Sequence, residues 1–445
     1  MTNLCSLEEH FCLELTDELR EWFTAGPPLD EKLFEFHQKV TLEELLDLEK
    51  GVEKNIQIWP GFLPPDTLPL LSNGLGDWLL LRVLPSGEIS EVICWRHSGG
   101  DWVPWGRTLA EALLFDTIRQ QQGVAQEDTR QIDKSEPAML WCLENLPLDS
   151  TQESNLLYEI TKSRLVATPK VSDPVCYPTQ NPIVPDLWEL LVDYRLCEVV
   201  ARRDLCQYYL NSPLRERAHL TDAQKLNVSW RPDFIQWLSD TRTIPEEKRS
   251  LLQEYYNLGE DELFNQDWEK VRDLLHPLVQ KRGDLMWVLN LAGWQAEVLH
   301  QPDQAIMYYY QAIKASSFTD ESVRFRMNWT EESFWKFPAA RLYSYAKVVP
   351  EALKKDDYLQ ILWEQDISNL PNTVARYWFE KGVQCKRKGE YWQAYQNFYK
   401  AGWDVEHSTL QMFPTILQEL SVCANNSGGR GLARLAEMYH QALVS

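Results

Sequence analysis

Between residues 41 and 118 the spacing of apolar and polar positions predicts a helix, then an antiparallel sheet, then a second helix. Thr41 and Glu44 stand three residues apart ahead of a stripe of leucines, which is the arrangement of a helix-capping box. Thr108 and Glu111 repeat this arrangement ahead of the second helix. The inward-facing stripe of that helix is Leu109, Ala112, Leu113 and Phe115. This order of elements is typical of the α+β class.

The sheet is predicted from three short runs separated by turns. Residues 78–84 form an apolar run with the length of a central strand, and residues 89–97 alternate between two faces. Residues 85–87, Pro-Ser-Gly, join these two runs as a turn, because Pro presets φ and Gly accepts a positive φ. Residues 102–105 form a third strand. Pro104 places that strand at an edge, since proline has no N–H to donate to a neighbouring strand.

A run of prolines divides the chain. Five prolines fall between residues 169 and 185, a density that favours an extended linker. We therefore predict an acidic α+β domain over residues 1–166 and a linker over residues 167–186. Over residues 187–445 apolar residues recur at helical spacing, which predicts an all-α domain.

The all-α part carries a recurring set of small and aromatic residues. One unit has Leu289, Ala292, Gly293 and Ala296, followed by Ala305, Tyr309 and Ala312. Another has Trp378, Gly382 and Cys385, followed by Ala394, Phe398 and Ala401. Partial copies stand 34 residues away, at Tyr255, Leu258 and Gly259 upstream and at Ala339, Tyr343 and Ala346 downstream.

This pattern resembles tetratricopeptide repeats over residues 250–405. In such repeats the small residues let two antiparallel helices approach closely, and the aromatic residue fills the gap to the next unit. The resemblance implies an irregular α-solenoid, because the units are unevenly spaced. An ordinary helical bundle with chance spacing of Ala and aromatic residues is the alternative.

Three motifs in the first domain stand in an order that a known family shares. They are residues 73–80 (Asn-Gly-x-Gly-Asp-Trp-Leu-Leu), residues 93–97 (Ile-Cys-Trp-Arg-His) and residues 105–113 (Trp-x2-Thr-Leu-x-Glu-Ala-Leu). Together with Leu63-Pro64, they resemble the SUKH superfamily, which includes fungal regulators of cell-wall synthesis of the Knr/Smi type and many bacterial immunity proteins. The resemblance implies a protein-interaction domain without catalysis. In the bacterial branch it implies binding and neutralising a toxin domain, often a nuclease.

The charge of the chain is unevenly distributed. The formal net charge is −22, and residues 1–130 hold 23 Asp and Glu against 10 Lys and Arg. Phosphate contacts need Lys and Arg, so this balance argues against nucleic acid or an anionic membrane as the partner. The acidity is either a solvated surface or a surface complementary to a basic partner, such as a basic toxin or nuclease domain.

Cysteine use and hydropathy point to an intracellular chain. The nine cysteines are odd in number and none stand in C-x-x-C spacing, so neither a disulfide scaffold nor a zinc site is predicted. The first residues have no basic stretch followed by an apolar run, and no 18-residue apolar stretch occurs. We therefore expect a cytoplasmic protein with no membrane span.

The usual signatures of catalysis are missing from the sequence. It has no G-x-S-x-G, H-E-x-x-H, P-loop or G-x-G-x-x-G motif, and no two histidines stand four apart. We therefore predict a protein that is not an enzyme and that has no catalytic residue, cofactor or metal ligand.

Candidate contact residues in the first domain lie at the end of the predicted sheet. Trp102 and Trp105 flank a proline in an edge strand, and tryptophan is enriched at binding hot spots. Asp101 and His97 stand beside them. Core packing is the alternative for the two tryptophans, and a structural role is the alternative for the histidine. Trp95 shares a face with Ile93 and is predicted to lie in the core.

Candidate contact residues in the all-α part follow from helical geometry. Tyr308, Tyr309 and Tyr310 cannot all face inward at 100° per residue. Tyr309 is the predicted core residue, which leaves Tyr308 and Tyr310 to line a concave surface. Trp392 is predicted to be exposed beside an inward Ala394 by the same argument.

Three functions remain open at this stage. The first is a partner-binding protein of the immunity type. The second is a regulatory scaffold that links several host proteins, as the fungal relatives in the resembled family do. The third is an enzyme of unrecognised type, for which a polar pocket with converging titratable groups would be the sign.

Overall fold

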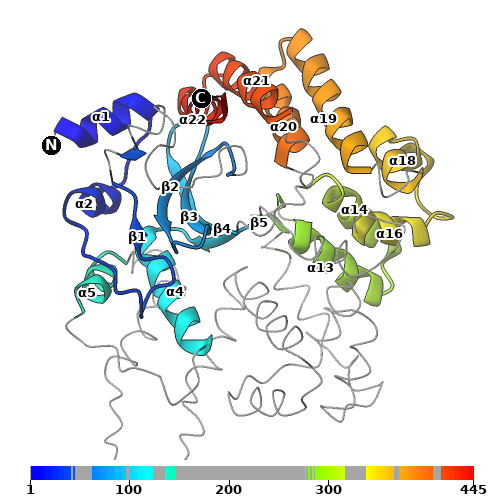
Figure 1. The fold of residues 1–445 in the computed structure, drawn as a ribbon. Helices are drawn as coiled ribbons and strands as arrows, with labels where there is room; N and C mark the ends of the chain where they lie inside the picture. The colour runs from blue at the N-terminus through cyan, green and yellow to red at the C-terminus, as the bar shows by residue number, and fades with distance from the viewer. Residues whose placement is uncertain are drawn as a thin grey trace, which may run out of the picture.

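A computed structural model places an N-terminal antiparallel sheet with helices beside a C-terminal array of helices (Figure 1). The residues that the structure describes are 2–41, 44–45, 63–96, 101–123, 136–146, 276, 279–280, 283–284, 286–315, 337–364, 370–403 and 412–444. The predicted combination of an α+β part and an all-α part is therefore present.

The sheet is a five-stranded antiparallel meander in the order β1-β2-β3-β4-β5. Its strands are β1 (Gln38–Lys39), β2 (Thr67–Ser72), β3 (Trp78–Val83), β4 (Ile89–Arg96) and β5 (Asp101–Gly106). The three predicted strands and the edge position of β5 are confirmed within the described residues. Strands β1 and β2 were not predicted from the sequence. The second of these is buried along its whole length and so shows no alternation of polar and apolar residues.

The turn between β2 and β3 explains the residues at the start of the first family-like motif. Asn73 Oδ1 accepts the backbone N–H groups of Leu75 at 2.8 Å and Asp77 at 3.1 Å. Gly74 and Gly76 have φ angles of 73° and 104°, which glycine adopts without a steric cost. The Asn-Gly-x-Gly-Asp sequence thus specifies a tight turn that leads into a central strand.

Among the described residues, the helices beside the sheet include α1 (Thr2–Phe11), α2 (Asp17–Ala25), α4 (Leu109–Gly123) and α5 (Pro137–Glu144). The predicted start of α4 is confirmed, because Thr108 Oγ1 accepts the N–H of Glu111 at 3.3 Å. The predicted inward stripe of α4 is fully buried or nearly so. The capping box at Thr41 and Glu44 is also confirmed, with reciprocal bonds of 2.7 and 3.2 Å.

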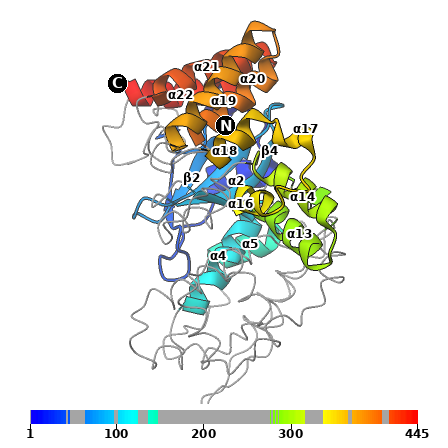
Figure 2. The same cartoon turned by 90° about the vertical axis from the view of Figure 1, so that its right-hand side faces the viewer.

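The C-terminal helices follow one another around the sheet (Figures 1 and 2). They are α13 (Met286–Val298), α14 (Pro302–Ala312), α16 (Phe337–Ser344), α17 (Glu351–Lys354), α18 (Asp357–Glu364), α19 (Leu370–Arg387), α20 (Tyr391–Trp403), α21 (Phe413–Asn426) and α22 (Arg430–Val444). The main packing partners of most of these helices are their neighbours in this series, and α22 also packs on α1. In both views α19–α22 lie above the sheet, while α4 and α5 lie below it.

Two helical hairpins in this array are packed in the same way. In α13–α14, a Cβ on Gly293 would lie 2.5 Å from the ring of Tyr309. In α19–α20, a Cβ on Gly382 would lie 2.7 Å from the ring of Phe398. The small residue on the first helix therefore makes room for the aromatic residue on the second. The spacing predicted that the small residues let the two helices approach closely, but it placed the aromatic ring in the gap to the next unit, whereas each ring lies against a glycine of its own unit.

The other two predicted units have different outcomes. Tyr343 of the downstream unit is 53% exposed, so the expectation that it fills a gap between helices is wrong, although Ala339 is fully buried as predicted. Tyr343 instead meets the edge of Trp363 of α18, with ring centroids 5.8 Å apart. The upstream unit, with Tyr255, Leu258 and Gly259, lies outside the described residues.

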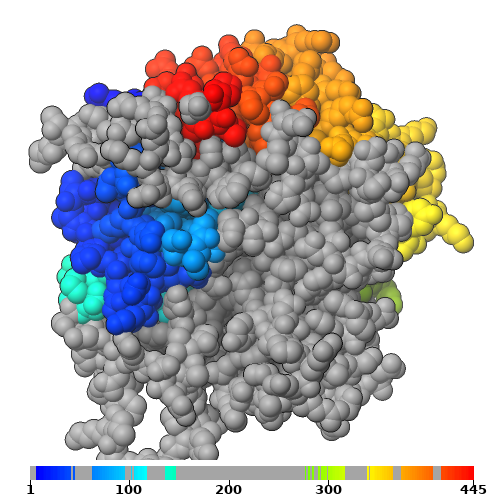
Figure 3. Space-filling view, viewed as in Figure 1, coloured from blue at the N-terminus to red at the C-terminus, as the bar shows by residue number. Residues whose placement is uncertain are grey.

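Sheet and helical array meet along residues 63–67, just before and at the start of β2. Trp403 Nε1 of α20 donates to the carbonyl of Leu63 at 3.0 Å, and the Tyr439 hydroxyl of α22 donates to the carbonyl of Thr67 at 3.0 Å. One buried apolar cluster continues from the sheet into the helices. In the space-filling view, α19–α22 run across the top of the molecule above the N-terminal residues (Figure 3). The predicted linker at 167–186 lies outside the described residues, and the domain limits stay a prediction.

Candidate functional site

The sheet keeps its tryptophan side chains inside. Trp102 and Trp105 are only 3% and 1% exposed, which corrects the expectation that they face a partner. Trp102 lies opposite Trp95 in the β4–β5 pairing, and the Arg82 guanidinium covers its ring at 4.6 Å. Trp105 packs edge-on against Phe115. Trp95, at 1% exposed, is confirmed as a core residue.

The other two candidates of the first domain are only partly described. Asp101 begins β5 and pairs in register with Arg96. The side chain of Asp101 and the whole of His97 lie outside the described residues, so their contact roles stay predictions.

The three tyrosines of α14 have three different environments. Tyr309 is fully buried, as predicted, and its hydroxyl donates to Glu297 at 2.9 Å. Tyr308 and Tyr310 are half-buried. The Tyr310 hydroxyl donates to Asp356 Oδ2 at 2.5 Å, and Lys314 Nζ donates to the same carboxylate at 2.8 Å. Burial, with Asp356 adding to it, raises the pKa of Tyr310. The Tyr310 hydroxyl thus ties α14 to the residue before α18.

Trp392 lies at the start of α20 and is half-buried, which corrects the prediction that it is exposed. Its ring is stacked on Tyr395, with centroids 5.1 Å apart and an angle of 9° between the planes. Ala394, which lies between these two residues in the sequence, is fully buried, as predicted. The stacking already restricts the rotamers of Trp392. A partner that covers this indole would therefore cost little further side-chain conformational entropy.

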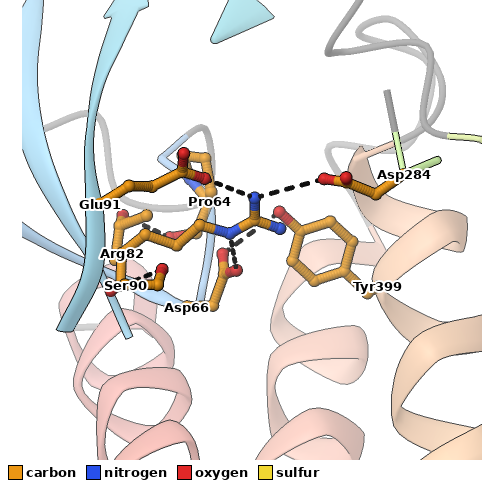
Figure 4. A network of polar contacts seen from close by, with 8 residues as sticks. Pro64, Asp66, Arg82, Ser90, Glu91, Asp284 and Tyr399 are labelled. Carbon is orange, nitrogen blue, oxygen red and sulfur yellow. Dashed lines mark hydrogen bonds and ion pairs between the residues drawn. The ribbon is translucent and has the colours of Figure 1, made fainter. Parts of the chain in front are cut away.

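A polar cluster that the sequence analysis did not predict joins the sheet to the helices (Figure 4). Arg82 of β3 donates from Nε to Asp66 at 3.1 Å and from Nη1 to Glu91 of β4 at 3.1 Å. Asp284, ahead of α13, lies 3.8 Å from the same guanidinium nitrogen. The Tyr399 hydroxyl of α20 donates to the other oxygen of Asp66 at 3.2 Å. Segments far apart in the sequence therefore meet at Arg82.

The carboxylates of this cluster act on the pKa values of Arg82 and Tyr399. Burial alone would lower the pKa of Arg82, but the nearby carboxylates, Asp66 foremost, outweigh it and raise the pKa. Burial and Asp66 likewise raise the pKa of Tyr399 well above its ordinary value. Three carboxylates face one guanidinium, and the two closest, Asp66 and Glu91, have side chains only 11% exposed. The cluster is suited to holding these segments together, because removal of Arg82 would leave the buried carboxylates without the cation that they bond.

One signal in the sequence predicts part of this cluster. An arginine interrupts the apolar run of residues 78–84, and the predicted turn at 85–87 brings a residue of the next strand opposite it. That residue is Glu91, which pairs with Arg82 in the register of β3 and β4. Asp284 and Tyr399 carry no such signal, because their approach depends on how the helical array packs.

In the part of the chain that the structure describes, no group of three or more His, Cys, Asp or Glu is arranged to hold a metal ion. The described helices include none that is both long and apolar enough to span a membrane. Comparisons of the chain with protein-family models, with curated proteins and with solved structures found no match.

Proposed function

We propose that this chain is a non-enzymatic protein-binding protein of the cytoplasm, with a SUKH-like N-terminal domain and a tetratricopeptide-like helical domain. The observation that carries the proposal is the pair of matching hairpins, α13–α14 and α19–α20. Each places a glycine of its first helix against the aromatic ring of its second helix. Stacked helix pairs of this kind build extended surfaces that bind other proteins.

The helical domain offers aromatic side chains suited to this role. Tyr308, Tyr310 and Trp392 are half-buried on packed helices and are not enclosed in the core. Tyrosine and tryptophan supply a large contact area at a small entropic cost, and they dominate binding hot spots. We assign contact with a protein partner to these three residues.

The N-terminal domain supplies charge. Its exposed carboxylates in the described residues are Glu9, Glu14, Asp17, Glu21, Asp30, Glu31, Glu88 and Glu144. Glu14 and Glu88 are paired by a β-bridge, so two of these carboxylates belong to neighbouring backbone segments. A basic partner would be steered to such a surface, and association would slow as salt screens it. The immunity version of the proposal, with a basic toxin or nuclease domain as partner, follows from this charge and from the SUKH resemblance.

The test of the immunity version is co-expression with a toxin encoded beside this chain, followed by binding measurements on the purified pair. We expect protection of the cells and a stable complex whose association rate falls between 50 and 300 mM salt, by about tenfold. The double variant Glu14→Gln and Glu88→Gln should slow association. Glu380→Gln, which removes an exposed carboxylate from α19, is the matched control.

Other outcomes separate the competing functions. Absence of both protection and complex contradicts the immunity version. Recovery of several host proteins through the helical domain, with no toxin among them, favours the regulatory scaffold. Turnover of a substrate by the purified chain would contradict the non-enzymatic proposal as a whole.

A further inference from the structure

The last helix of the chain, α22, lies within the N-terminal part of the molecule. Figure 1 shows it above the sheet, between α1 and α21. Residues 431–443 are all buried or half-buried. The apolar face of α22 is at most 2% exposed and consists of Leu432, Leu435, Ala436, Met438 and Tyr439. A helix with such a face needs partners on which to bury it, and α21 and α1 supply part of them.

Two glycines let other segments come close to the backbone at the end of α1. A Cβ on Gly431, in the first turn of α22, would lie 3.2 Å from the carbonyl oxygens of Phe11 and Cys12. A Cβ on Gly87, in the turn between β3 and β4, would lie 2.6 Å from the Cys12 oxygen. The end of α1 is therefore held between the C-terminal helix and the sheet.

The backbone of Cys12 is strained at this point. Its φ angle is 51°, in the left-handed region that a residue with a Cβ adopts only at a cost in free energy. Such a conformation persists where the surrounding contacts impose it. Two residues later, Glu14 donates its N–H to the carbonyl of Gly87 at 2.9 Å. The chain thus leaves α1 in a conformation that depends on its contacts with the sheet and with α22.

Hydrogen bonds fix α22 on both sides. Arg434 donates from Nε to the carbonyl of His10 at 3.3 Å, and its Nη1 pairs with Glu437 of the same helix at 2.7 Å. On the sheet side, the buried Tyr439 hydroxyl donates to the carbonyl of Thr67 at 3.0 Å. The bonds to His10 and Thr67 join positions that are 424 and 372 residues apart in the sequence. The two ends of the chain therefore meet at α22.

We propose that α22 is a clasp that holds the α1–α2 junction, residues 10–15, against the sheet, so that α1 and α22 open together. None of the contacts that form the clasp involves α13 or α14, so this hairpin stays packed when the clasp opens. The exposed Glu9 precedes the junction and the exposed Glu14 lies within it. The C-terminal helix thereby positions part of the acidic surface. The clasp itself is independent of the function proposed above.

The experiment is hydrogen exchange of the full-length chain, in the wild type and in variants of two glycines. Gly431→Ala places a methyl group against two backbone oxygens of the junction. It should lower the protection of both α22 and the last turn of α1 by about tenfold, and leave α13–α14 as in the wild type. Gly293→Ala is the matched control. It should lower the protection of α13–α14 and leave α1 and α22 unchanged.

Two results would overturn the proposal. In the first, Gly431→Ala lowers the protection of α22 and leaves α1 protected. In the second, Gly293→Ala lowers the protection of α1 as much as Gly431→Ala does, which means that the whole chain opens in one step. If Gly431→Ala does not fold, Tyr439→Phe takes its place, because it removes one hydrogen bond and adds no atom. It should lower the protection of α22 and α1 together by about fivefold, and an unchanged α1 would contradict the clasp.

Discussion

The sheet and the helical array use their large aromatic side chains differently. The four tryptophans of β3, β4 and β5 are each at most 4% exposed, whereas Tyr308, Tyr310 and Trp392 of the helices are half-buried. The sheet is covered on both sides, by α20 and α22 above and by α4 and α5 below (Figures 1 and 2). An array of helix pairs has a smaller core per unit, so more of its aromatic residues lie at its surface. This difference in burial is the basis of our proposal that the helices contact a partner through aromatic side chains and the sheet domain through charge.

The largest expected effect comes from breaking the joint between the two regions at Arg82. Arg82→Ala leaves Asp66 and Glu91 buried without their cation, and should lower the free energy of unfolding by about 3 to 5 kcal/mol. Urea unfolding measures the loss. Arg20→Ala, which removes a cation from an exposed pair on α2, should leave the urea midpoint unchanged. Equal losses of stability in the two variants would contradict the claim that Arg82 holds the sheet and the helical array together.

The next effect tests whether the two helical hairpins are equivalent. Gly293→Ala and Gly382→Ala each place a methyl group against an aromatic ring, at 2.5 and 2.7 Å. Each substitution should lower the free energy of unfolding by about 1 to 3 kcal/mol, because the added methyl group forces the packed ring out of its position. Thermal unfolding checks both, with Gln396→Ala on the exposed side of α20 as the control. If a hairpin keeps its full unfolding free energy with alanine, the close contact between its glycine and its aromatic ring is contradicted.

A smaller effect is expected within the helical array at Tyr310. Tyr310→Phe removes the hydrogen bond to Asp356 and the one that Lys314 Nζ donates to the hydroxyl, and it keeps the aromatic ring, so it should cost about 1 to 2 kcal/mol of unfolding free energy. The same variant should keep its affinity for a partner, since the hydroxyl is already bonded within the chain. A loss of binding without a loss of stability would show that the partner uses the hydroxyl.

Local patterns in the sequence predicted much of the fold. The turn at residues 85–87, the strands beside it and the cap of α4 follow from residue types within a few positions of one another. The close approach of the two helices in each hairpin was predicted from their small residues, but the aromatic ring was expected in the gap to the next unit and lies instead against a glycine of its own unit. The burial of Trp102 and Trp105 was only the alternative to a partner contact, since it depends on Arg82 and on Phe115 of α4. Tyr343 follows the repeat spacing but lies at the surface, because spacing does not fix how one helix is rotated against the next.

Binding by the helical aromatic residues is the central claim, and one titration tests it most directly. A partner recovered with the tagged full-length chain would be purified and titrated against the wild type, Trp392→Ala and, as a control, Trp102→Phe, by calorimetry. The proposal predicts saturable binding that weakens by about tenfold or more in Trp392→Ala and is unchanged in the control, where the altered side chain is buried. Unchanged affinity in Trp392→Ala, with binding lost only in sheet-domain variants, would contradict the claim.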